Sequence, residues 1–143
     1  MKIGIDFDNT IVEYNELFYR KALEKGIVPI TCEKTKKGVR SDLIKQGKEK
    51  EFTLLQGEVY GKHIIETEPK KEMIRAIKQI KSVDIEILII SHKTRFPYLG
   101  PKYDLHEAAY KWLDKNGFYD KEIIGILPEN TYFIEEKENK IKK

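Results

Sequence analysis

Cysteine is almost absent from this chain of 143 residues, in which Cys32 is the single one. One cysteine excludes an internal disulfide framework and any zinc site built from several cysteines, and it makes a reducing compartment, the cytoplasm, the expected location. Long apolar runs are missing too: no stretch approaches the roughly 18 residues of a membrane span, and the N-terminus lacks the apolar core of a signal peptide. We therefore expect no association with a membrane.

The sequence also lacks a large excess of either charge. It contains 27 Lys and Arg residues against 24 Asp and Glu residues, a net charge of +3, which does not indicate a nucleic-acid partner without a clustered basic patch. The lysines are interleaved with glutamates, and no platform of aromatic and basic residues for nucleic acid is evident. With 40% hydrophobic and 36% charged residues, the chain is expected to form one domain with a real core and a heavily solvated surface.

The apolar pattern predicts alternating strands and helices. Short β-branched runs predict strands at residues 2–6, 85–90 and 131–134. Helical spacing predicts helices at residues 14–25, 69–81 and 105–116 and after residue 135. Trp112 and Leu113 lie on the apolar face of the third helix, which we expect to pack on the sheet. This order indicates an α/β fold with a Rossmann-like parallel sheet, in which the strand at 85–90 is central.

The stretch from residue 26 to residue 67 breaks this pattern. Its apolar periodicity is weak, and glycines punctuate a polar segment rich in lysine. We interpret residues 13–68 as a small subdomain inserted after the first strand, and residues 1–12 and 69–143 as the core. Lysines such as Lys36 and Lys37 in the insert could meet an anionic substrate, although such charge runs are usually solvated surface.

Two carboxylates, Asp6 and Asp8, directly follow the first predicted strand in the run DFDNT. Parallel α/β sheets bind ligands beyond the carboxyl ends of their strands, where Ser91 follows the second strand. One carboxylate can attack phosphorus while its neighbour moves protons, and an oxygen-coordinated Mg²⁺ would offset the gathered negative charge. The plainer alternative is that Asp6, Asp8 and Asn9 only form a turn.

The run DFDNT, residues 6–10, resembles the first motif, D-x-D-x-T, of the haloacid dehalogenase (HAD) superfamily, and the apolar strand ending in Ser91 resembles its second motif. The resemblance implies a HAD core with a small cap after the first strand, Asp6 as nucleophile, Asp8 as general acid and base, and both as Mg²⁺ ligands, Asp8 through its carbonyl. It implies that the Ser91 hydroxyl binds the phosphoryl group. Because family members that hydrolyse phosphate esters keep the second Asp, it implies a phosphatase that cleaves a small phosphorylated metabolite through an aspartyl-phosphate.

The third motif of the family is a lysine that neutralises the nucleophile and the phosphate. We favour Lys140, in the helix predicted after residue 135, as this catalytic residue, and Lys102, in the loop PYLGPKYD, is the alternative. His92 and Lys102 are further assigned to substrate binding, together with Ser91.

The fourth motif is an acidic pair after another apolar strand. Glu135 and Glu136 could be this pair, which would move the third-motif lysine to Lys102. We favour the interpretation that they begin the last helix and that the pair lies beyond Lys143, so that the chain is truncated before a last strand and is a poor enzyme. The competing functions are a non-catalytic HAD-like module and a phosphoacceptor signalling domain. Neither the substrate nor the oligomeric state can be inferred.

Overall fold

The computed structural model describes residues 1–135 and divides the chain into two compact units. The first unit is formed by Met1–Glu13, Glu68–Thr94 and the segment from Ala109 onward, and the second by Tyr14–Thr67 and Arg95–Ala108. The helix predicted after residue 135 lies outside the described residues. No helix within residues 1–135 has the length and apolar character needed to cross a membrane.

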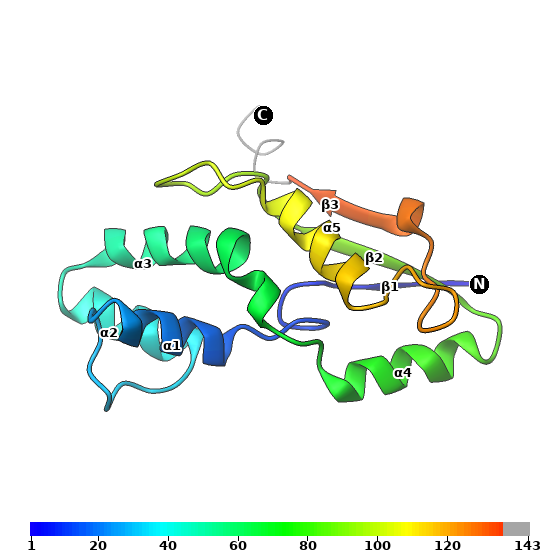
Figure 1. Cartoon of the computed structure of the whole chain (residues 1–143), viewed down its shortest axis with the longest axis horizontal. Helices are drawn as coiled ribbons and strands as arrows, with labels where there is room; N and C mark the ends of the chain where they lie inside the picture. The colour runs from blue at the N-terminus through cyan, green and yellow to red at the C-terminus, as the bar shows by residue number, and fades with distance from the viewer. Residues whose placement is uncertain (136–143) are drawn as a thin grey trace. The chain divides into compact units, whose positions relative to one another are not determined.

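The first unit contains a parallel three-stranded sheet in the order β1-β2-β3 (Figure 1). The strands are β1 (Lys2–Ile5), β2 (Glu86–His92) and β3 (Thr131–Ile134). These three strands confirm the predicted strand positions and the α/β class. β2 continues beyond the predicted end at residue 90, because Ser91 and His92 still pair with Phe133 and Ile134 of β3.

Two helices of the first unit connect its strands, α4 (Lys71–Lys81) and α5 (Leu105–Lys115), and a short turn, η3 (Pro128–Asn130), precedes β3. The first turn of α5 belongs to the second unit. Trp112 of α5 is 1% exposed and meets the Phe7 ring edge-on, with 5.5 Å between ring centroids. The Tyr110 ring contacts Phe133 of β3 at 5.0 Å. The Tyr110 contact places α5 against the sheet, as predicted, and Trp112 packs on Phe7, which follows the end of β1.

The exposure of β2 alternates along the strand. Ile87, Ile89 and Ser91 are buried, whereas Glu86, Ile90 and His92 are exposed, and Leu88 is intermediate. Successive strand residues point to opposite faces, so the helices of the first unit, α4 and α5, cover the Ile89 face of the sheet. β2 is the central strand of the sheet, as predicted.

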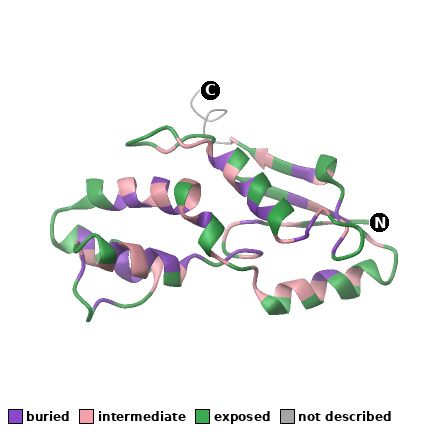
Figure 2. Cartoon of the chain, in the orientation of Figure 1, coloured by how far each residue is buried: buried purple, intermediate pink, exposed green. Residues whose placement is uncertain are grey.

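The second unit is helical. It contains α1 (Asn15–Glu24), α2 (Lys36–Lys45), α3 (Glu49–Gly57) and the short turns η1 (Glu58–Lys62) and η2 (Ile64–Glu66). Buried residues alternate with exposed ones along all three helices, as expected for amphipathic helices that pack together (Figure 2). Aromatic rings join these elements: Phe18 stacks on Phe52 with centroids 5.7 Å apart, and Tyr60 meets the Tyr14 ring at 4.7 Å.

Glycines explain why the sequence pattern of this unit was weak. A Cβ atom on Gly57 would lie 2.7 Å from the Pro97 side chain, and one on Gly61 would lie 2.4 Å from the Tyr103 side chain. These glycines are thus points of close packing between α3–η1 and the loop 95–104, and η1 follows α3 directly after Gly57. In the sequence, each glycine interrupts the helical spacing of apolar residues. The neighbouring side chain that fills the space beside the glycine is visible only in the structure.

The carboxylate of Glu66 contacts three basic side chains in the second unit. Arg20 Nη1 lies 2.8 Å from its Oε1, and Lys21 Nζ and His63 Nδ1 lie 3.1 and 2.9 Å from its Oε2. The hydrogen bonds from Arg20 and then Lys21 lower the pKa of Glu66 from 4.5 to about 2.

Acid should therefore weaken this unit in a defined pH window. Because the pKa of Glu66 is lowered on folding, its stabilising contribution is present above pH about 4.5 and is lost as the pH falls toward about 2. We expect Glu66→Gln to lower the free energy of unfolding by about 1 kcal/mol at pH 7, since the pairs are partly exposed, and by much less at pH 2. Urea titrations at both pH values measure this difference, with Glu51→Gln on the exposed surface of α3 as the matched control. An equal loss at both pH values would contradict the ion-pair origin.

Candidate functional site

The run DFDNT forms a tight turn at the carboxyl end of β1. The Phe7 carbonyl accepts the N–H groups of Thr10, Ile11 and Val12 at 3.0–3.3 Å. Asn9 adopts a left-handed backbone with φ 62°, a conformation that asparagine tolerates better than most residues. The turn leaves Asp6 exposed, and its Oδ1 accepts the Phe7 N–H at 2.7 Å. The carboxylate of the predicted nucleophile is thus accessible at the expected sheet edge.

The structure pairs Asp8 with Lys93, a lysine that the sequence analysis did not select. Lys93 Nζ lies 3.1 Å from both carboxylate oxygens of Asp8 and 5.7 Å from the centroid of the Phe7 ring. The Lys93 side chain is only 3% exposed and that of Asp8 is 22% exposed. Burying an ammonium group without a counter-charge costs several kcal/mol, so Asp8 and Lys93 hold one another in place.

The position of Lys93 follows from the end of β2. Its backbone N–H donates to the Ile134 carbonyl at 2.9 Å, which extends the pairing with β3 by one residue. Lys93 lies two residues after Ser91 and four after Ile89, in phase with the buried positions of the strand. In the sequence, Lys93 could have been recognised as buried because it is in phase with the apolar positions of the strand. The chain contains so many lysines that residue type alone did not single it out.

Ser91 and His92 lie at the predicted end of the central strand but differ in environment. Ser91 is 3% exposed, on the face that α5 covers, whereas His92 is exposed on the opposite face. Because neighbouring strand residues alternate between faces, Ser91 and Lys93 share one face of the sheet and His92 does not. Ser91 therefore lies on the same strand and the same sheet face as Lys93, the partner of Asp8. His92 lies on the opposite face.

The other predicted lysines and acids lie on other segments of the chain. Lys102 is exposed in the loop 95–104 of the second unit. The ends of this loop are joined by an ion pair, in which Arg95 Nε lies 3.6 Å from Asp104 Oδ2. Lys140 and Glu136 lie outside the described residues. Glu135 follows β3, which β2 separates from β1, so its backbone lies at least two strand spacings, about 10 Å, from that of Asp6. This position does not favour Glu135 as an acidic neighbour of Asp6.

The motif offers Mg²⁺ the carboxylates of Asp6 and Asp8 and the main-chain carbonyl of Asp8. Within residues 1–135 no group of three or more His, Cys, Asp or Glu side chains is placed to hold a metal ion, and both Asp8 oxygens contact Lys93. Proteins commonly hold Mg²⁺ with one or two carboxylates together with water and substrate phosphate. The residues present fit a weakly held ion whose main protein ligand is Asp6.

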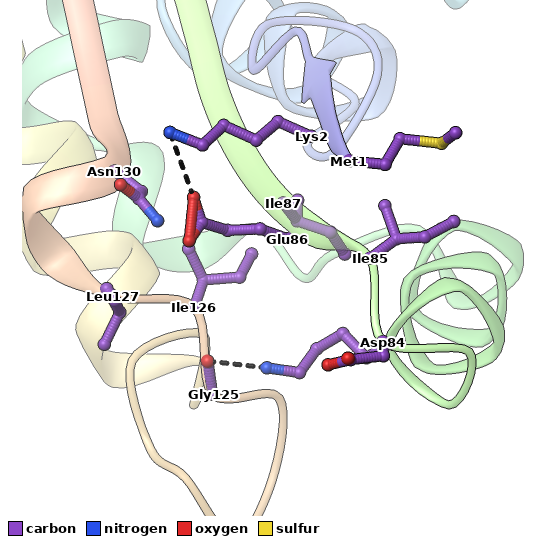
Figure 3. Close-up of a pocket in the computed structure, with 11 residues that line it drawn as sticks. Met1, Lys2, Asp84, Ile85, Glu86, Ile87, Gly125, Ile126, Leu127 and Asn130 are labelled. Carbon is purple, nitrogen blue, oxygen red and sulfur yellow. Dashed lines mark hydrogen bonds and ion pairs between the residues drawn. The ribbon is translucent and has the colours of Figure 1, made fainter.

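A pocket of about 440 Å³ lies elsewhere in the first unit, at the amino ends of β1 and β2 (Figure 3). Lys2 and Glu86 form an ion pair of 3.5 Å in its wall, and Lys81 Nζ donates to the Gly125 carbonyl at 2.7 Å. Ligands of parallel α/β sheets bind at the opposite, carboxyl ends of the strands. Since both lysines of the pocket already have partners in the fold, we place the candidate site at the carboxyl edge.

Comparison with family models, with curated proteins and with solved structures gave no match for this chain. The resemblance to the HAD superfamily therefore depends on the motif residues themselves.

Proposed function

We propose that this chain is a magnesium-dependent phosphatase of the HAD type, which transfers the phosphoryl group of a small phosphate ester to Asp6. The observation that carries the proposal is the buried Lys93 paired with Asp8, two residues from the exposed Asp6 and at the carboxyl edge of a parallel sheet. A buried, rigidly placed cation beside an accessible carboxylate is a suitable environment for a dianionic phosphate.

The proposed reaction has two steps. In the first, a carboxylate oxygen of Asp6 forms a bond to phosphorus while the bond from phosphorus to the leaving oxygen breaks, and Asp8 supplies the proton that this oxygen takes. In the second, water attacks the aspartyl-phosphate, Asp8 takes the water proton, and inorganic phosphate and Asp6 are released. Lys93 keeps Asp8 oriented throughout and offsets part of the charge that the phosphate brings. A bound Mg²⁺ would supply further charge compensation on the phosphoryl oxygens.

A non-catalytic module is the second candidate function. It is favoured by the donor set: within residues 1–135 only two carboxylates gather at the edge, and Lys93 occupies both oxygens of one of them. Such a module would bind a phosphorylated ligand without turning it over.

Phosphate release by the purified 143-residue chain separates the two candidates. With p-nitrophenyl phosphate we expect slow hydrolysis that Mg²⁺ stimulates roughly tenfold or more over an EDTA control, with half-saturation at millimolar Mg²⁺ because few protein ligands hold the ion. A phosphatase that contaminates the preparation would be revealed by activity that does not co-elute with the protein. The absence of both Mg²⁺-stimulated hydrolysis and covalently bound phosphate would favour the non-catalytic module.

A further inference from the structure

The aromatic ring of Phe7, the middle residue of the run DFD, has no part in the proposed reaction steps. Phe7 is fully buried, with 0% of its surface exposed, although it stands between the exposed Asp6 and the half-buried Asp8. Its main-chain carbonyl holds the turn by accepting three N–H groups. The side chain of Phe7 therefore has a separate environment, which its neighbours define.

Two aromatic neighbours fix the plane of the Phe7 ring. The centroids of Trp112 of α5 and Phe133 of β3 each lie 5.5 Å from that of Phe7, at interplanar angles of 85° and 76°. Edge-to-face pairs are favourable because the positive edge of one ring meets the negative face of the other. The Phe7 ring is thus held from a helix and from a strand of the first unit.

The ammonium group of Lys93 lies over the ring that these contacts fix. Its Nζ is 5.7 Å from the centroid of Phe7, within the roughly 6 Å over which an aromatic ring attracts a cation. This attraction is stronger where water is excluded, and the Lys93 side chain is only 3% exposed. The same Nζ lies 3.1 Å from each carboxylate oxygen of Asp8. One ammonium group therefore contacts an aromatic ring and a carboxylate at once.

We propose that Phe7 is a positioning residue, whose ring holds the ammonium group of Lys93 and through it the carboxylate of Asp8. This role rests on the proposed function, in which Asp8 gives its proton to the leaving oxygen. The lysine stem is flexible, and the ring restricts where its ammonium group can lie. Orientation matters because a misplacement of about 1 Å can cost roughly a hundredfold in rate. A leucine in place of Phe7 would fill much of the same space without attracting the cation.

Stepwise fluorination of the Phe7 ring tests this role with little change in shape. Each fluorine withdraws electrons from the ring face and weakens its attraction for a cation. We expect the kcat of Mg²⁺-stimulated hydrolysis to fall with each added fluorine, by about tenfold for trifluorophenylalanine, with KM nearly unchanged. The matched control is trifluorophenylalanine in place of Phe118, which is equally buried and contacts Trp112 at 5.7 Å. This control should keep the parental kcat.

The leaving group separates a positioning role from a general loosening of the core. Phenolate is more basic than p-nitrophenolate, so its departure depends more on the proton that Asp8 supplies. Fluorination of Phe7 should therefore slow the hydrolysis of phenyl phosphate several-fold more than that of p-nitrophenyl phosphate. A loosened core would slow both reactions equally. Phe7→Leu should show the same selective loss, and it replaces the fluorinated variant if that variant does not fold.

Urea unfolding gives a measurement that does not depend on activity. Trifluorophenylalanine at position 7 should raise the equilibrium constant of unfolding several-fold in the parent and leave it unchanged in Lys93→Met, which removes the ammonium group from the ring.

Two kinds of result would overturn the proposal, and they are distinguishable. An active parent that fluorination of Phe7 does not slow, an equal loss with both esters, or an unfolding effect that persists in Lys93→Met would exclude the positioning role and leave the proposed function intact. A parent without Mg²⁺-stimulated hydrolysis of either ester would overturn the proposed function, and the positioning role with it.

Discussion

Asp6→Asn is expected to abolish Mg²⁺-stimulated phosphate release, with a loss of at least about a thousandfold, because an amide oxygen is a poor nucleophile toward phosphorus. The substitution is nearly isosteric, and the amide still offers a carbonyl oxygen to the Phe7 N–H that Oδ1 accepts in the parent. Since Asp6 is exposed, the free energy of unfolding should change little. Steady-state hydrolysis and trapping of covalent phosphate measure the effect.

Asp84→Asn is the matched control for this variant. Asp84 is exposed in the same unit, next to the amino ends of the strands, and its φ of 60° is one that asparagine also adopts readily. Activity should therefore stay at the level of the parent. Retention of parental hydrolysis by Asp6→Asn would show that Asp6 is not the nucleophile, whereas an inactive parent would return the choice to the non-catalytic module.

The strands and their order along the chain could be predicted because they depend on local composition. The β-branched run at residues 85–90 and the acidic turn after Ile5 are visible without any partner, and so is the apolar face of α5 that carries Trp112. Strand ends were less predictable. β2 extends through Ser91 and His92 only because β3 offers carbonyl and N–H groups alongside, which is a property of the sheet and is absent from the segment itself.

The ion pair at the candidate site illustrates what local patterns miss. Asp8 and Lys93 are separated by 85 positions in the sequence, and their contact depends on the parallel register that places Ile5 beside Ile89. Lys140 and Lys102 are candidates for the third-motif lysine because of their order along the chain. Order along the chain does not take into account on which face of the sheet a side chain lies. Strand phase puts Lys93 on the buried side after Ile89 and Ser91 and would have added it to the candidates, since a buried lysine requires a carboxylate nearby.

Lys93→Met should destabilise the first unit by about 3 kcal/mol and lower phosphatase activity sharply. Removing one partner of a buried ion pair leaves the other charge uncompensated, which typically costs 3–5 kcal/mol, and the 22% exposure of Asp8 places this pair at the lower end. Asp8→Asn should cost a similar amount, because it removes the carboxylate whose oxygens lie 3.1 Å from the more deeply buried ammonium group. Urea unfolding at pH 7 measures both losses.

The double variant Asp8→Asn/Lys93→Met distinguishes the ion pair from two independent packing losses. If the two charges stabilise each other, removing both leaves no uncompensated charge, and the double variant should lose clearly less than the sum of the two single losses. Lys70→Met is the control, since Lys70 is only half-buried and its Nζ donates to the carbonyl of Asn9 in the same turn at 3.2 Å. Losses that add within error, or a Lys93→Met variant as stable as its parent, would contradict the pairing and with it the assignment of Lys93 as the cation that positions Asp8 at the site.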